Sequence, residues 1–285
     1  YSVSWHKEDA MFNWNNFGIP PAPAVGYQLT ATGQTTQYNS ELDDGYYEKG
    51  IAKSYTVTTT GAGSGTTTLD LSHLVDTGIS FDAASKELRC AGKCGVFKAA
   101  GGETIVVSGS TVPGNNAAWT TASADANKVV LTTAPGDEAA GASITVKKRD
   151  AMSNNTVYDE NTKLTWIRYV NTKFGVAGDG KMPWYNYVYD IFQYCAVANA
   201  ASLGGYTDWR VPNCLELTSL MNLEAATAAP DAVAFPSWPT DNVWASTTAP
   251  ASTTTALITN FSNGYVSAGT KTSTAGLYCA LVRGG

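Results

Sequence analysis

The sequence predicts an α+β protein in which an all-β module precedes a mixed C-terminal domain. Three observations support this fold class. Seven short β-branched segments recur about every ten residues between 78 and 147. Apolar residues then recur at helical spacing between 184 and 201, and a second helix signal begins at Asn213. We therefore divide the 285 residues into an N-terminal arm and lead-in (1–55), an inserted module (56–150) and a C-terminal domain (151–285).

The composition indicates a substantial core beneath a polar but weakly charged surface. Apolar residues make up 44% of the chain, and charged residues only 15%, against about a quarter in ordinary domains. The net charge of −6 argues against a nucleic-acid partner, because such binders neutralise phosphates with Lys and Arg. No apolar run approaches the roughly 20 residues of a membrane span. The sequence begins without an initiator Met or a signal-like stretch, which we interpret as a processed or trimmed product consistent with export.

The N-terminal arm (1–26) combines aromatic side chains with a proline-rich stretch. The aromatics are Trp5, Phe12, Trp14 and Phe17, and the prolines stand at positions 20, 21 and 23. Proline excludes a helix here and favours an extended path. The aromatics pack either onto the arm's own domain or onto a neighbouring subunit. Further along, the acidic cluster Glu41–Gly45 could offer oxygens to calcium, but its spacing does not match an EF-hand, so we expect a solvated turn and no cofactor.

The inserted module opens with the Thr-rich stretch 56–68, which reads as a linker or long loop. The seven strand segments after it are 78–82, 87–89, 95–98, 103–108, 118–121, 128–133 and 142–147. Short strands at this spacing predict an Ig-like sandwich or a small barrel. No cluster of titratable residues accompanies them, so we expect a spacer or packing module.

Five cysteines are present, and two of them lie close together in the module. Cys90 and Cys94 enclose a short Gly-containing turn, which favours a disulfide and an oxidising compartment over two reduced thiols. The two histidines, His6 and His73, have no cysteine spacing suited to zinc, so we predict no metal site.

The C-terminal domain begins with a predicted hairpin at 156–167 and continues into two helices. On the first, from about 184 to 201, Trp184, Val188, Ile191, Phe192, Cys195 and Ala198 recur at helical spacing and predict a core-facing row. The second starts at the N-cap Asn213, with Glu216 completing a capping box, and ends before Pro230. Cys214 would be its first residue, and we favour a buried or disulfide-bonded role over a nucleophile because no histidine lies nearby in sequence. Asn263-Gly264 predicts a type I′ hairpin turn.

The stretch from Gly204 to Asn213 (GGYTDWRVPN) joins the two predicted helices. Its glycines permit positive φ, and its aromatic residues can bury a ring while keeping one polar atom for a partner. Asp208 and Arg210 fall on one face of an extended backbone. We predict that this stretch braces the fold and that its side chains are held in hydrogen bonds. The residues assigned to the brace are Tyr206, Asp208, Trp209, Arg210, Asn213 and Glu216.

The pattern from 155 to 285 resembles the Lcl C-terminal domain family, named for a bacterial collagen-like adhesin. The pieces that carry the resemblance are NTVYDENTKLTW, GGYTDWRVPN, VWASTT, NFSNG and the final VRGG. The resemblance implies a C-type-lectin-like fold, with two helices against small antiparallel sheets. Such domains are similar to the variable proteins of diversity-generating retroelements. The resemblance also implies a disulfide between Cys195 and Cys279, although family members often carry the last cysteine two positions later.

We expect a non-catalytic extracellular or virion-surface binding protein, an adhesin or receptor-binding protein, whose partner is a cell-surface protein or glycan. Short polar side chains with a few Tyr and Trp make an adaptable binding surface, although ordinary solvated loops have the same composition. The candidate ligand-binding residues are Trp244, Ser246, Thr247, Thr248, Thr254, Asn260, Asn263, Tyr265, Ser267 and Thr270.

Two other functions are weighed against this one. The alternative is a structural subunit of an extracellular filament, pilus or phage tail that self-assembles through the N-terminal arm. An enzyme is disfavoured, because no Ser/His/Asp spacing, phosphate loop or zinc motif occurs. The oxidase-type relatives implied by the resemblance need a reactive cysteine pair, for which Cys214 with Cys279 is a poor candidate.

Overall fold

The structure is a computed structural model that describes residues 52–59, 65–171, 173–175, 178–186, 188–250, 252–273 and 276–284. Within these residues the protein is mostly β-structure with two α-helices. The predicted aromatic arm, the acidic cluster at 41–45 and the middle of the Thr-rich stretch lie outside the described residues.

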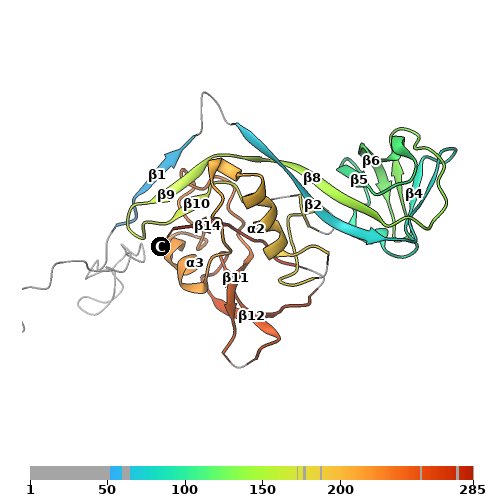
Figure 1. Cartoon of the computed structure of the whole chain (residues 1–285). Coiled ribbons are helices and arrows are strands. Elements are labelled where there is room, and N and C mark those ends of the chain that lie inside the picture. The colour runs from blue at the N-terminus through green and yellow to red at the C-terminus, as the bar shows by residue number, and fades with distance from the viewer. Residues whose placement is uncertain are drawn as a thin grey trace, which may run out of the picture.

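The C-terminal domain contains two small antiparallel sheets and both helices (Figure 1). The first sheet has the order β1 (Tyr55–Thr58), β9 (Thr156–Asp159), β10 (Thr165–Ile167) and β14 (Val282–Arg283). The second has the order β11 (Asn242–Thr248), β12 (Thr255–Asn260) and β13 (Val266–Thr270). The helices are α2 (Ile191–Ala200) and α3 (Cys214–Leu220), and α3 packs on β11 and β12.

A long two-stranded ribbon connects this domain to the inserted module. β2 (Thr66–Asp76) and β8 (Ile144–Ser153) pair from Thr66 with Ser153 to Asp76 with Ile144. Leu69, Leu71 and Met152 at one end join the core of the C-terminal domain. Leu74, Ile144 and Val146 at the other end join the core of the module. Figure 1 shows the ribbon running past α2 and out to the module. The Thr-rich stretch is thus a linker only in part, since β1 and the start of β2 are strands.

The module is one continuous antiparallel sheet that curls around an aliphatic core. Its order is β2-β8-β5-β6-β7-β4-β3, and its core includes Ile79, Leu88, Ile105 and Val129. The strands beyond the ribbon are β3 (Ser80–Asp82), β4 (Glu87–Arg89), β5 (Thr104–Ser108), β6 (Ala118–Ala124) and β7 (Lys128–Leu131). Six of the seven predicted segments coincide with β3 to β8. The segment predicted at 95–98 begins instead with a 3₁₀ turn, Cys94–Val96, in which the Phe97 N–H donates to the Cys94 carbonyl at 3.1 Å.

Helix α2 begins at Ile191, later than the predicted start near 184. The cause is Asp190, whose Oδ1 accepts the N–H groups of Phe192 and Gln193 at 2.9 and 2.8 Å. This N-cap begins the helix there, so Trp184 approaches the core from a non-helical segment. Helix α3 ends at Leu220, well before Pro230, because the next residue, Met221, has an extended backbone.

The turn between β12 and β13 also differs from its prediction. A type I′ turn needs positive φ at both central residues, but of Asn263 and Gly264 only Gly264 has it, at +78°. The Gly264 N–H donates to the Asn260 carbonyl at 2.9 Å, and Asn260 pairs with Tyr265. The hairpin is therefore closed by the four residues 261–264.

Candidate binding surface

The stretch predicted as a brace makes hydrogen bonds that tie α3 to the last strand. Arg210 exchanges backbone hydrogen bonds with Val282 at 2.8 and 2.9 Å. Its guanidinium donates to both carboxylate oxygens of Glu216, at 2.7 and 2.6 Å. Glu216 also accepts the Asn213 N–H at 2.8 Å, and the Asn213 side chain accepts the Glu216 N–H at 2.9 Å. The capping box and the ion pair thus form one unit, which raises the pKa of Arg210 through its hydrogen bond to Glu216.

Trp209 forms the buried part of the brace. Its indole N–H donates to the Leu203 carbonyl at 2.8 Å. Asn199 on α2 completes a pair of bonds with the Trp209 backbone, accepting its N–H at 2.7 Å and donating to its carbonyl at 2.8 Å. Trp209 therefore fixes the end of α2 against the stretch that follows it.

Asp208 and Tyr206 contact the end of the chain. Arg283 donates from Nε to Asp208 at 2.7 Å, and its guanidinium lies 4.0 Å from the centre of the Tyr206 ring. The hydrogen bond from Arg283 lowers the pKa of the Asp208 carboxyl. The charged side chains of the brace are thus engaged in ion pairs within the domain.

The candidate ligand-binding residues fall into three groups by exposure. Trp244 is 1% exposed, donates its indole N–H to the Met182 carbonyl at 2.9 Å and belongs to the core. The structure therefore removes it from the ligand face. Ser246, Thr247 and Asn260 are half-buried. The exposed residues are Thr248, Thr254, Asn263, Tyr265, Ser267 and Thr270.

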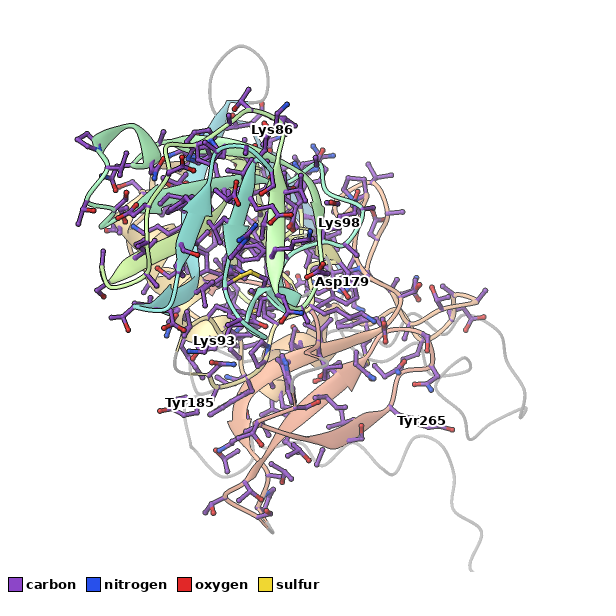
Figure 2. The ribbon with its side chains drawn as sticks, turned by 90° about the vertical axis from the view of Figure 1, so that its right-hand side faces the viewer. Lys86, Lys93, Lys98, Asp179, Tyr185 and Tyr265 are labelled. Atoms are coloured by element: carbon purple, nitrogen blue, oxygen red, sulfur yellow. A yellow bond between two sulfur atoms is a disulfide. The ribbon has the colours of Figure 1, made fainter. Side chains whose placement is uncertain are left out.

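The half-buried residues hold the exposed ones in place. Asn260 Oδ1 accepts the N–H groups of Ser262 and Asn263 at 2.8 and 3.1 Å, which orders the hairpin loop. Thr247 Oγ1 accepts the Cys214 N–H at 3.1 Å, so β11 satisfies a donor in the first turn of α3. Tyr265, 70% exposed, then projects from an ordered hairpin. Figure 2 shows Tyr265 and Tyr185 pointing outward on opposite sides of the lower half of the molecule.

A shallow groove of about 410 Å³ lies beside α2 and was not predicted. Tyr185, Asn186, Phe192 and Gln193 are among the residues that line it, with Tyr185 50% and Phe192 38% exposed. Sequence periodicity had assigned Phe192 to the core. The buried residues of α2 are Ile191, Tyr194, Cys195 and Ala198, and Phe192 lies outside the face that they form.

Lys271 joins this groove to the hairpin. Its Nζ lies 4.2 Å from the centre of the Trp184 ring and donates to Thr248 Oγ1 at 2.8 Å. Its backbone carbonyl accepts the Tyr185 N–H at 3.2 Å. The aromatic groove therefore adjoins Thr248 and the C-terminal end of β13, whereas Tyr265 lies at the other end of that strand.

A cavity of about 130 Å³ lies where the module meets the domain. Lys148, 2% exposed, donates to the Gly175 carbonyl at 2.6 Å and lies 2.9 Å from Glu103 Oε1. Burial lowers the pKa of Lys148. Two other cations of the lining are also paired, Arg149 with Asp70 and Lys173 with Asp150. Of these contacts, Lys148 with Gly175 and Lys173 with Asp150 connect the sheet of the module to the C-terminal domain.

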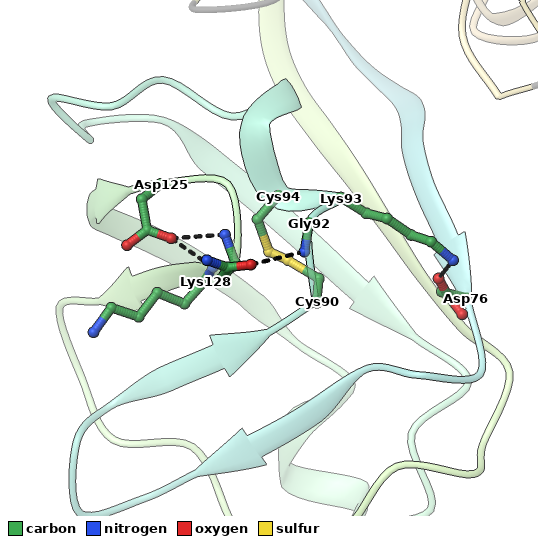
Figure 3. Close-up of a disulfide and its surroundings, with 8 residues drawn as sticks. Asp76, Cys90, Gly92, Lys93, Cys94, Asp125 and Lys128 are labelled. Atoms are coloured by element: carbon green, nitrogen blue, oxygen red, sulfur yellow. Dashed lines mark hydrogen bonds and ion pairs between the residues drawn. A yellow bond between two sulfur atoms is a disulfide. The ribbon is translucent and has the colours of Figure 1, made fainter.

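Two of the cysteines form a disulfide and three are free. Cys90 and Cys94 are bonded in the module, with Cα atoms 5.5 Å apart (Figure 3). The Gly92 N–H of the same turn donates to Asn127 Oδ1 at 3.0 Å. Cys195, Cys214 and Cys279 are buried free thiols. The disulfide that the family resemblance implied between Cys195 and Cys279 is therefore not formed.

Two of the three free thiols instead donate to carbonyl groups. Cys195 Sγ donates to the Trp209 carbonyl at 3.0 Å and Cys279 Sγ to that of Ala280 at 3.3 Å. Burial raises the pKa of Cys195 to about 11 and raises those of Cys214 and Cys279. Thiols with raised pKa values are protonated at neutral pH and are poor nucleophiles.

The fold and surface define a β-rich domain with two helices, a brace between them and exposed polar loops. Residues 155–283 match the family model of the Lcl C-terminal domain. No curated protein and no solved structure matches the chain. No helix in the described part of the chain is long and apolar enough to cross a membrane. The described residues also contain no group of three or more His, Cys, Asp or Glu that could hold a metal ion.

Proposed function

We propose that the chain is a non-catalytic binding protein of an extracellular or virion surface, an adhesin or receptor-binding protein. The observation that carries this proposal is the ordered hairpin with Tyr265 exposed at its end and polar residues beside it. A rigid exposed tyrosine loses little conformational entropy on binding, and neighbouring Ser, Thr and Asn supply adaptable hydrogen bonds. The partner class is a cell-surface protein or glycan.

We also propose the finer fold assignments. The C-terminal domain has a C-type-lectin-like arrangement, which is supported by two helices packed on small sheets and by the pairing of β10 with β14. That pairing brings the end of the domain beside its beginning. For the module, the continuous strand order supports a small curled barrel over an Ig-like sandwich, which needs two facing sheets.

The extracellular location and the lack of catalysis belong to the same proposal. The Cys90–Cys94 disulfide supports an oxidising compartment, since such bonds persist mainly in exported proteins. Buried thiols with raised pKa values and charged side chains engaged within the fold support a protein that binds without reacting.

The full chain can test this proposal in a screen against arrays of glycans and extracellular proteins. We expect Tyr265→Ala to weaken a bound ligand by about tenfold or more, as truncation of an aromatic anchor does. Val233→Ala is the matched control, because Val233 is 79% exposed but lies in the loop before β11. A ligand whose affinity is unchanged by Tyr265→Ala, Asn263→Ala and Thr270→Ala would contradict the proposed ligand face.

A second candidate function is the structural subunit that assembles with copies of itself. The specific observation in its favour is β13, the outer strand of the β11-β12-β13 sheet. Exposed strand edges pair readily with other chains.

A further inference from the structure

Strand β13 has one edge that no described residue pairs with. Its other edge pairs with β12, from Thr255 with Thr270 to Thr259 with Val266. Neither the sheet order nor the isolated bridges place a further described strand beside it. Four of its five residues are exposed, so both faces of the strand are also largely open.

The hydrogen-bond pattern of the hairpin decides which backbone groups point outward. Asn260 donates to the Tyr265 carbonyl at 2.8 Å, and Lys271 donates to the Thr254 carbonyl at 3.0 Å. Because hydrogen-bonded and non-hydrogen-bonded pairs alternate in an antiparallel ladder, Ser267 and Gly269 also bond toward β12. Val266, Ala268 and Thr270 then direct their N–H groups away from the sheet. These N–H groups can donate to the carbonyl groups of an added strand.

In the part of the chain that the structure describes, the edge lacks the devices with which proteins block strand pairing. Such devices are charged residues, prolines, bulges and covering loops. The sequence of β13 is Val-Ser-Ala-Gly-Thr, with no charge and no proline, and its pairing with β12 contains no bulge. Val266 is 44% exposed at one end. An uncharged, regular edge of this kind fits an occupant that is also extended and uncharged.

We propose that β13 accepts residues Tyr1–Trp5 of a neighbouring copy of this chain as an added strand. Tyr1, Val3 and Trp5 alternate with two serines, the period-2 pattern of a half-buried strand, and the segment carries no charged side chain. Its main chain supplies the donors and acceptors that the β13 edge leaves open, and its aromatic side chains add buried area. Symmetric pairing of β13 with a second β13 would bury only small side chains, less than a stable dimer needs.

A donor from another copy makes the contact one between chains, as the second candidate function requires. A donor segment and an acceptor edge at different places on one chain give a head-to-tail contact, which builds a ring or an open filament. This inference rests on the second candidate function and is tested separately from the ligand screen, because Ser267 and Thr270 of the proposed ligand face lie on the same strand.

The test uses three full-length variants measured by sedimentation. Ala268→Pro removes an outward N–H without touching the bonds to β12, as edge prolines do. Ala268→Thr keeps that N–H and is the control. Val3→Asp with Trp5→Asp places two charges on the donor segment. We expect the wild type and Ala268→Thr to self-associate, and the acceptor and donor variants to associate at least about tenfold more weakly.

Mixing distinguishes this contact from other modes of association. The Ala268→Pro variant keeps its donor and the Val3→Asp/Trp5→Asp variant keeps its acceptor, so an equimolar mixture should form a one-to-one complex. A synthetic Tyr1–Lys7 peptide should bind the donor variant and dissociate wild-type assemblies, which also tests the site if Ala268→Pro fails to fold. A monomeric wild type, self-association by the donor variant, or no complex in the mixture would each overturn the proposal, whatever the ligand screen finds.

Discussion

The inserted module and the C-terminal domain are stabilised in different ways. The module core consists of aliphatic side chains from neighbouring strands, with few aromatic rings among them. The C-terminal domain buries large aromatics, including Trp166, Trp244, Tyr194 and Phe174. Its elements are short, and side-chain to backbone bonds such as those of Asn199 and Asp190 fix them. The structure of the module follows from strand patterns that are local in the sequence. The structure of the C-terminal domain depends on contacts between residues that are far apart in the sequence.

The ribbon of β2 and β8 belongs to both regions and shows where they meet. The pairing of β2 with β8 shifts register between Ser72 and Leu74, so His73 is the extra residue of a bulge. Its ring stacks on Tyr189 of the C-terminal domain, with centroids 4.4 Å apart. Lys148 on the facing strand reaches Gly175 of the same domain. The ribbon is therefore anchored to the domain by side chains and does not act as a loose tether.

The largest expected effect comes from removing the buried aromatic of the brace. Trp209→Ala deletes a side chain that is 3% exposed together with its hydrogen bond to Leu203. We expect the free energy of unfolding of the C-terminal domain to fall by about 3–5 kcal/mol. Hydrogen exchange at the amides of α2 and β14 should accelerate, while exchange in the module stays unchanged.

Trp119 in the module provides the matched comparison. It is half-buried on β6 and donates its indole N–H to the Asn115 carbonyl at 3.1 Å. Trp119→Ala should lower the free energy of unfolding of the module by about 1–2 kcal/mol. An equal or larger loss for Trp119→Ala would mean that the two regions are not stabilised differently.

A smaller effect, dependent on pH, should arise at the junction. Burial, with a contribution from the Lys148 charge, lowers the pKa of His73 to about 3. At neutral pH the folded state therefore holds a neutral ring, whose Nδ1–H donates to the Leu71 carbonyl at 2.9 Å. The unfolded chain takes up a proton near its ordinary pKa of about 6.5. His73 therefore contributes stability that is complete above about pH 6.5 and is lost as the pH falls toward 3.

Denaturant unfolding between pH 7.5 and 4 measures this contribution. His73→Phe keeps an aromatic ring against Tyr189 but cannot take up a proton. Its free energy of unfolding should fall less steeply with decreasing pH than that of the wild type, by a few kcal/mol across the range. Parallel pH profiles for the two proteins would show that His73 is protonated in the folded state.

The sequence predicted the module better than the C-terminal domain for a physical reason. Most module strands alternate one buried and one exposed face, and that pattern is local. In β11 neither face is free, since Val243 and Ala245 pack in one core cluster and Trp244 in the other. Because β11 lacks this alternation, no sequence pattern indicated that Trp244 is buried, and Trp244 was assigned to the exposed loops.

Pairings between distant segments were equally hidden. β10 pairs with β14 through Thr165 and Arg283, and β1 pairs with β9 through Tyr55 and Asp159. No local pattern specifies either partner, so the Thr-rich stretch that contains β1 looked like a linker. The N-cap of α3 lay within reach, because Asn213 and Glu216 are three residues apart. The groove beside α2 could not be predicted in this way, because the helical spacing of apolar residues also includes Trp184 and Val188, which precede the Asp190 cap.

The smallest expected effect concerns the ion pair in the middle of the ribbon. Arg149 on β8 faces Asp70 on β2 and donates from Nε and Nη2 to its two carboxylate oxygens, both at 2.7 Å. The pair is partly exposed, so water and salt screen it, and a double-mutant cycle with Asp70→Asn and Arg149→Gln should give a coupling of about 0.2–1 kcal/mol. Raising the salt concentration should reduce that coupling further. A coupling above about 2 kcal/mol that resists salt would mean that this pair stabilises the ribbon far more than a partly exposed ion pair does.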